Sequence, residues 1–150
     1  MPDIYTAEWY EALKEMINRN PEVEKNAPRG RYRVLAEIKG DSQSHYVPVD
    51  ESKTFLVRFE EGKCTEYRQL DDKPPRKGFD FIFELPGSVF EGIAAGVIDL
   101  IGAGLKGLIK ITGDMRILMR HADLVNAIYH VYTREVPTEW PKGKPPYAGT

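Results

Sequence analysis

Residues 107–115 have the sequence GLIKITGDM, which predicts a strand, a turn and the start of a helix in quick succession. Leu108 to Thr112 is a short apolar run interrupted by one lysine, a pattern typical of a strand. Gly113 supplies the turn. Asp114 is a good N-cap because its carboxylate can accept a hydrogen bond from a free N–H group of the first helical turn. The stretch therefore predicts the last strand of a sheet, followed directly by the last helix.

That last helix, expected to run from Asp114 to about Tyr132, is apolar around most of its circumference. One narrow polar stripe runs along it, formed by Arg116, Arg120, Asp123, His130 and Arg134. A helix of this kind must be covered on more than one side. The cover could be the sheet together with a ligand, or the sheet together with another subunit.

The segment before the strand, residues 86–106, is apolar and rich in glycine. Each glycine inside a helix costs about 1 kcal/mol relative to alanine. We therefore predict two short helices that are broken near Gly96, with Ser88 as the N-cap of the first. Their apolar face consists of Phe90, Ile93, Ala94, Val97, Ile98, Ile101 and Leu105.

The N-terminal half begins with a helix and continues as strands. Apolar residues recur with helical spacing from Trp9 to Ile17, with Thr6 as a plausible N-cap and Asn20-Pro21 as the stop. A connecting loop follows, and the period then changes to two. Strands are predicted at 31–39, 53–60, 64–70 and 78–85, with a tight turn at 61–63. Four strands in series favour an antiparallel sheet with one solvent-exposed face.

Composition excludes several classes of protein. A chain of 150 residues is enough for one domain with a sizeable core. The content of 41% hydrophobic and 29% charged residues is typical of a folded chain rather than a disordered one. With 21 basic and 23 acidic side chains, the net charge is −2. A nucleic-acid binder needs a basic face to neutralise phosphates, so we expect no nucleic-acid partner.

The sequence also bears on the compartment. Cys64 is the single cysteine, which rules out an internal disulfide and fits a reducing environment. The first residues show no secretory signal, and the last ones, 147–150, carry no peroxisomal or prenylation signal. The most apolar stretch, 85–111, contains four charged residues and is a poor membrane span. We therefore expect a cytoplasmic protein with at most transient membrane contact.

Known catalytic and cofactor motifs do not fit. The run GAGLKG at 102–107 has the glycine spacing of a dinucleotide-binding loop, but a helix precedes it and a strand follows it, the reverse of the required order. His45, His121 and His130 lack metal-ligand spacing, and Ser88 is not in a nucleophile elbow. We predict no catalytic residue, no metal site and no cofactor.

What remains is more apolar surface than one face of a sheet can cover. It could be ordinary core, a dimer or partner interface of an accessory subunit, or the lining of an apolar cavity. A further alternative is a small enzyme acting on a hydrophobic substrate, with Asp99, Asp114 or Tyr129 as the acid or base. Periodicity leaves these alternatives open.

The 107–115 stretch resembles the strand–turn–helix ending of the sterol carrier protein type two family, whose members carry an apolar-Lys-apolar-x-Gly-Asp-Met pattern there. The upstream order of helix, strands, hairpin, Phe-rich strand and Gly-punctuated helical segment is also similar, so that the resemblance covers residues 6–132. The loop 40–52 is longer than the family pattern, the last helix runs on, and a Pro-rich tail follows from Thr133 to Thr150. The domains would then be a lipid-binding domain, 1–132, and a C-terminal tail, 133–150.

The resemblance implies an α+β fold with a five-stranded, mainly antiparallel sheet and helices packed on one face. It also implies an apolar tunnel for a fatty acid, fatty acyl-CoA, phospholipid or sterol-like lipid, and no enzymatic activity. Arg116 or Arg120 could meet a lipid head group, and a homodimer is an open alternative. The expected wall residues are Phe81, Phe83, Phe90, Ile93, Val97, Ile101, Leu105, Met115, Leu118 and Met119.

Overall fold

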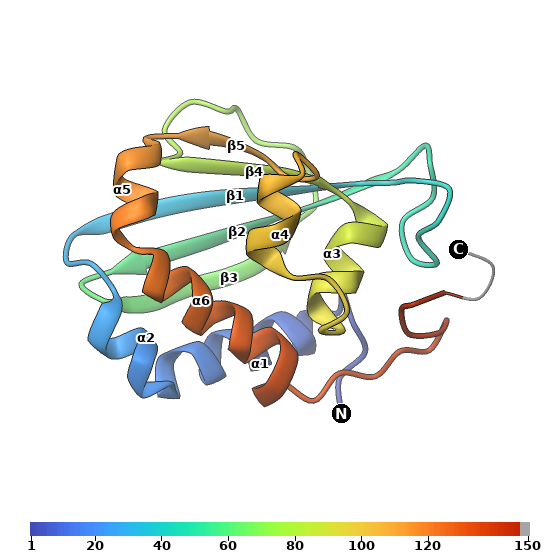
Figure 1. Ribbon diagram of the computed structural model, residues 1–150, viewed down its shortest axis with the longest axis horizontal. Coiled ribbons are helices and arrows are strands. Elements are labelled where there is room, and N and C mark those ends of the chain that lie inside the picture. The colour runs from blue at the N-terminus through green and yellow to red at the C-terminus, as the bar shows by residue number, and fades with distance from the viewer. Residues whose placement is uncertain (148–150) are drawn as a thin grey trace.

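The computed structural model describes residues 1–147, which form one sheet with helices packed on one face (Figure 1). The sheet has five strands in the order β3-β2-β1-β4-β5. This confirms the predicted α+β class. The bounds of the strands are β1 Arg31–Lys39, β2 Ser52–Glu60, β3 Lys63–Leu70, β4 Phe81–Pro86 and β5 Lys110–Gly113.

The sheet is mainly antiparallel, as expected, but β4 does not pair with the strand that precedes it. It runs parallel to β1, with Val34 opposite Phe81 and Ile38 opposite Leu85. The connection from β3 to β4 must therefore return along the length of the sheet. It does so on the face without helices, where Arg76 reaches the buried Glu37 and also Glu84.

The N-terminal helix α1 (Ala7–Arg19) begins and ends where the sequence predicts. The Thr6 hydroxyl accepts a hydrogen bond from the backbone N–H of Trp9, which confirms the N-cap. The expected loop after it is instead a short helix, α2 (Pro21–Asn26). Asn20 both ends α1 and caps α2, and Pro21 occupies the first position of α2, where no N–H is needed.

Two short helices do follow β4, broken at the predicted place. They are α3 (Gly87–Ala94) and α4 (Leu100–Leu105), and Gly96 between them has a positive φ of 79°. The predicted N-cap at Ser88 is wrong. Pro86 holds that position without a side-chain hydrogen bond, and the Ser88 hydroxyl donates instead to Asp41 of the 40–51 loop.

The last helix is not continuous. Asp114 is its N-cap, as predicted, and accepts a hydrogen bond from the N–H of Arg116. The helix then divides into α5 (Met115–Arg120), α6 (Ala122–His130) and a π-helical turn, η1 (Val131–Glu135). The break falls at His121, whose φ of −109° and ψ of 30° lie outside the helical region. The change of direction turns α6 towards α2, against which it packs on the same face of the sheet (Figure 1).

The predicted Pro-rich tail begins inside η1, and the segment that follows η1 folds back along the N-terminus. The backbone N–H of Ile4 donates to the carbonyl of Glu139, and the Trp9 indole N–H donates to the hydroxyl of Thr138. Tyr147 is buried. Residues 148–150, the end of the predicted tail, lie outside the described residues.

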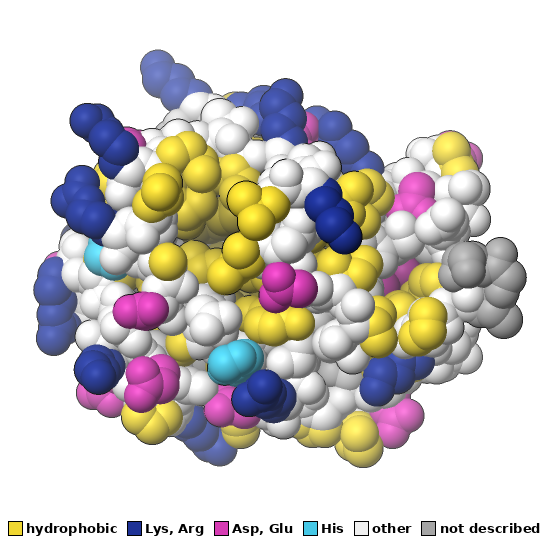
Figure 2. Space-filling model, in the orientation of Figure 1, with side chains coloured by type: hydrophobic (Ala, Val, Ile, Leu, Met, Phe, Trp, Pro, Cys, Tyr) yellow, Lys and Arg dark blue, Asp and Glu magenta, His cyan; other side chains and the backbone are white. Residues whose placement is uncertain are grey.

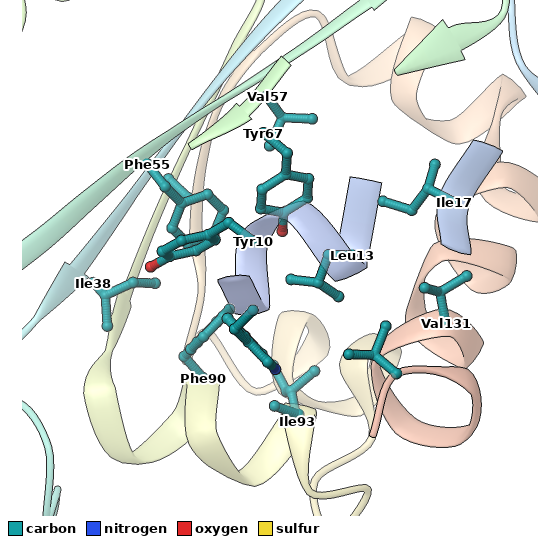
Figure 3. Packing of buried hydrophobic residues seen from close by; sticks show 14 of the residues in the cluster. Tyr10, Leu13, Ile17, Ile38, Phe55, Val57, Tyr67, Phe90, Ile93 and Val131 are labelled. Atoms are coloured by element: carbon teal, nitrogen blue, oxygen red, sulfur yellow. The ribbon is translucent and has the colours of Figure 1, made fainter. Parts of the chain in front are cut away.

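An aromatic cluster joins α1 to the sheet (Figure 3). The rings of Tyr10, Phe55 and Tyr67 lie 5.4 to 5.8 Å apart between centroids. Phe90 of α3 extends the cluster, with its ring 5.6 Å from that of Phe55. This core therefore closes one end of the space between the sheet and the helices.

Within residues 1–147, no helix is long and apolar enough to cross a bilayer.

Candidate functional site

Next to the aromatic core, the structure leaves a cavity of about 230 Å³ between the sheet and the helices. Its floor comes from the inward-facing positions of three strands. Val34 of β1, Val57 of β2 and Phe83 of β4 point to the same side of the sheet because side chains alternate along each strand. The two-residue period of the sequence thus decides which side chains form the floor.

Helices supply much of the rest of the wall. α3 contributes Phe90 and Ile93, and α5 contributes Ile117 and Leu118. From α6 come Leu124, Val125 and Ile128. The break at His121 makes this possible, because α5 and α6 can each turn an apolar side toward the same space. The lining is therefore almost wholly aliphatic and aromatic, with little that could hold a polar ligand group.

Of the ten predicted wall residues, five line this cavity: Phe81, Phe83, Phe90, Ile93 and Leu118. The other five do not line it and are exposed: Val97, Ile101, Leu105, Met115 and Met119. The structure thus places half of the predicted set outside the wall. The reason is geometric in α4, where Ala103 is the buried residue and Ile101 and Leu105 lie on the opposite side of the helix. Apolar spacing alone cannot distinguish the two sides.

Some of these exposed residues are chain neighbours of wall residues: Ile101 follows Leu100, and Met119 follows Leu118. Figure 2 shows a hollow ringed by hydrophobic side chains, at the place where Figure 1 draws the space between α4 and α5. Leu105 is 84% exposed and Met119 is 73% exposed. The cavity therefore has a mouth on this face, and the mouth itself is apolar.

Neither predicted head-group residue lines the cavity. Arg116 is exposed on α5 and pairs with Asp114, with Nε 3.4 Å from Oδ1. Arg120 is exposed at the end of the same helix. The polar groups in the wall are instead His121 and several tyrosines, of which Tyr129 donates from its hydroxyl to the carbonyl of Ile98 at 3.3 Å.

Sequence reasoning missed much of the wall. The floor residues of β1 and β2 could have been identified from the sequence, because the alternation of apolar and polar residues in these strands indicates one apolar face. The residues of α6 also lay on a recognised apolar side of the last helix. His121 carried no signal, because its place in the wall follows from a helix break that the sequence did not reveal.

The residues considered for an enzyme are dispersed. Asp99 and Asp114 are N-caps of α4 and α5, and each accepts from a backbone N–H. Hydrogen bonds from Arg116 hold the pKa of Asp114 below its usual range. Tyr129 alone of the three lines the cavity. Within the described range, 1–147, no three His, Cys, Asp or Glu side chains are grouped so that they could hold a metal ion.

A second cluster, polar and closely packed, lies on the other side of α3. Glu91 is 0% exposed, and its carboxylate accepts hydrogen bonds from the hydroxyls of Tyr5, Ser44 and Tyr147 at 2.6 to 2.9 Å. Burial raises the pKa of Glu91, although the three hydroxyl donors act in the opposite direction. The same burial, together with the charge of Glu91, raises the pKa of Tyr5. The cluster joins four segments of the chain and leaves the cavity wall apolar.

Solved structures share this fold. A crystal structure of sterol carrier protein 2 superposes with a TM-score of 0.74 at 17% identity, over 90% of this chain and 100% of that one. A conserved hypothetical protein of Thermus thermophilus, described as a possible sterol carrier protein, gives 0.73 at 16% identity, over 95% and 96%. The palmitated SCP2L2 protein of Aedes aegypti gives 0.50 at 20%, over 80% and 94%. No protein-family model matches the sequence, and no curated protein matches it significantly. The predicted resemblance is thus confirmed as a likeness of fold.

Proposed function

We propose that this chain, which has the sterol carrier protein 2 fold, binds a single-chain lipid in its apolar cavity and carries it without chemical change. The observation that supports this most is the wall itself, which is apolar from Val34 on the sheet to Ile128 on α6 and opens at an apolar mouth. The palmitated form of a protein with the same fold points to the same class of ligand.

The size of the cavity favours an acyl chain over a sterol. A water-sized group occupies about 30 Å³, so 230 Å³ takes about eight such groups. A flexible chain can place that many methylenes inside and leave its remaining length and its head in the mouth. A rigid ring system cannot be divided in this way and would require the wall to move.

The expected strength of binding is moderate. Each buried methylene contributes about 0.8 kcal/mol, so about eight contribute about 6 kcal/mol before the chain loses its freedom. Such an affinity suits a carrier, which must release its ligand. Most of the wall is aliphatic, and its groups that could transfer a proton are His121 and the tyrosines; no Asp or Glu of residues 1–147 lines the cavity beside them, which supports carriage rather than catalysis. We also propose that the protein works in the cytoplasm, which the unpaired thiol of Cys64 supports.

Variants that fill the cavity test the proposal. Val34→Phe and Val125→Phe each add a ring at a half-buried wall position, whereas Val49→Phe adds the same ring at a site that is 69% exposed and outside the wall. We expect the wall variants to weaken uptake of a fluorescent fatty acid about tenfold or more, because the ring takes the space of the chain. The Val49 variant should bind as the wild type does. Failure of the wild type to bind any fatty acid, or unchanged binding by both wall variants, would contradict the proposal.

A further inference from the structure

The exposed hydrophobic side chains are concentrated in one segment beside the cavity, where Ile101, Leu108 and Met119 directly adjoin lining residues in the chain. Of the eight large hydrophobic side chains that are exposed in residues 1–147, five lie in the segment 101–119, which covers β5 and most of α4 and α5. Scattered exposed apolar residues are ordinary, but a contiguous patch marks an interaction surface. We call these five residues the apolar rim: Ile101, Leu105, Leu108, Met115 and Met119.

Positive charge accompanies the rim. The segment 99–121 carries four basic and two acidic side chains, a net charge of +2, although the whole chain has a net charge of −2. Both acidic residues, Asp99 and Asp114, are engaged as helix caps. Lys106 and Arg120 are exposed, and neither has a carboxylate within ion-pair distance among residues 1–147. Figure 2 shows Lys and Arg side chains on both sides of the hydrophobic opening.

From this arrangement we propose that the apolar rim docks on the surface of a bilayer that contains anionic lipids, with the cavity mouth facing the bilayer. Apolar side chains enter the boundary between head groups and acyl chains, and flanking cations attract anionic head groups. The inference rests on the proposed function, since docking in this orientation lets an acyl chain pass between bilayer and cavity without crossing water.

A second copy of the chain fits this surface less well. A two-fold dimer through the rim would bring two copies of the same segment of net charge +2 into one interface, with Lys106, Arg116 and Arg120 of both copies in or beside it. Like charges brought together at an interface disfavour association. An anionic bilayer instead meets these cations with opposite charge, which is why the bilayer is the partner that the surface favours.

The experiment measures co-flotation with vesicles of phosphatidylcholine containing about 30 mol% phosphatidylglycerol. Leu105→Glu with Met119→Glu removes the apolar contact and adds two negative charges, and Lys106→Glu with Arg120→Glu reverses the charge of two cations. Matched controls are Val49→Glu, at an exposed apolar position off the rim, and Lys25→Glu with Lys63→Glu, exposed lysines on α2 and β3. Each basic residue near the surface contributes about fivefold in partitioning, so the rim charge variant should bind at least about 25-fold more weakly.

Three results support the proposal together: the wild type floats with the anionic vesicles, both rim variants lose flotation, and both controls keep it. Uptake in vesicle-free solution of a neutral alkane of about eight carbons, short enough to lie inside the cavity without reaching the mouth, should be unchanged in the rim variants, because these side chains do not line the cavity. Flotation equal in rim variants and controls would overturn docking while leaving the cavity proposal intact. A wild-type dimer that becomes monomeric in the rim variants, with no vesicle binding, would assign the rim to a second copy and would also overturn it. Loss of fatty-acid uptake by the wild type is a failure of the proposed function instead.

Discussion

The Tyr147 hydroxyl donates a hydrogen bond of 2.6 Å to Glu91 Oε1, across 56 positions of the chain. The partner oxygen, Oε2, accepts from Tyr5 at 2.7 Å, so one buried carboxylate joins both ends of the chain to α3. α3 also presents Phe90 and Ile93 to the cavity. The termini therefore support the helix that forms one wall of the candidate site.

Replacing Glu91 should change how stability depends on pH. Burial raises the pKa of Glu91 in the folded state above its unfolded value of about 4.3. The folded state then binds the proton more tightly, so this group's contribution to stability is full at low pH and is lost as the pH rises through the raised pKa. We expect Glu91→Gln to gain stability relative to the wild type between about pH 4 and 8.

Urea unfolding of both proteins across about pH 4 to 8 measures the difference. For each unit by which the pKa is raised, the free energy of unfolding of the variant relative to the wild type should increase by about 1.4 kcal/mol from the low-pH end to the high-pH end of the titration. A constant difference between wild type and variant across that range would show that Glu91 does not titrate differently in the folded state.

Asn20→Ala should destabilise the protein by about 1 to 2 kcal/mol, because it removes a helix cap. The Asn20 side-chain Oδ1 accepts hydrogen bonds from the backbone N–H groups of Glu22 and Val23 at 2.8 and 3.1 Å, and its side-chain Nδ2 donates to Glu135. Asn26→Ala in the same helix is the matched control, since Asn26 donates only one exposed bond to the Glu22 carbonyl. Chemical denaturation of the two variants should show a clearly larger loss for Asn20, and equal losses would argue against the cap.

The Cys64 thiol should be unreactive in the folded protein. Burial raises its pKa to about 12, and the side chain is 2% exposed. Since the thiolate is the reactive form, iodoacetamide at about pH 8 should modify the native protein at least about a hundredfold more slowly than the urea-unfolded protein. Mass spectrometry of timed samples measures both rates, and similar rates would mean that β3 opens readily.

Sequence periodicity predicted the elements well where one face of an element is buried. The strand at 31–39 and the break at Gly96 both appear as expected. The parallel position of β4 could not be predicted, because it depends on a crossing connection rather than on the pattern of the strand. α2 was missed because Pro21 can end one helix and begin another.

The candidate site was predicted less completely than the fold. Phe81 and Ile101 belong to equally apolar patterns, yet one lines the cavity and the other is exposed at its mouth. Periodicity identifies the apolar side of an element but not what covers it. That depends on the path of α4 and α5 over the sheet, and the break at His121, which sets the path of the last helix, has no evident signal in the sequence.

The central claim is that the cavity holds a lipid chain, and native mass spectrometry of the purified full chain tests it most directly. We expect a fraction of the protein to carry an additional mass. Organic extraction should release a fatty acid or another single-chain lipid in an amount nearly equal to that of the loaded protein. Val125→Phe should show the bare chain mass in the same preparation. A wild-type protein at the bare chain mass that also takes up no added fatty acid would contradict the claim.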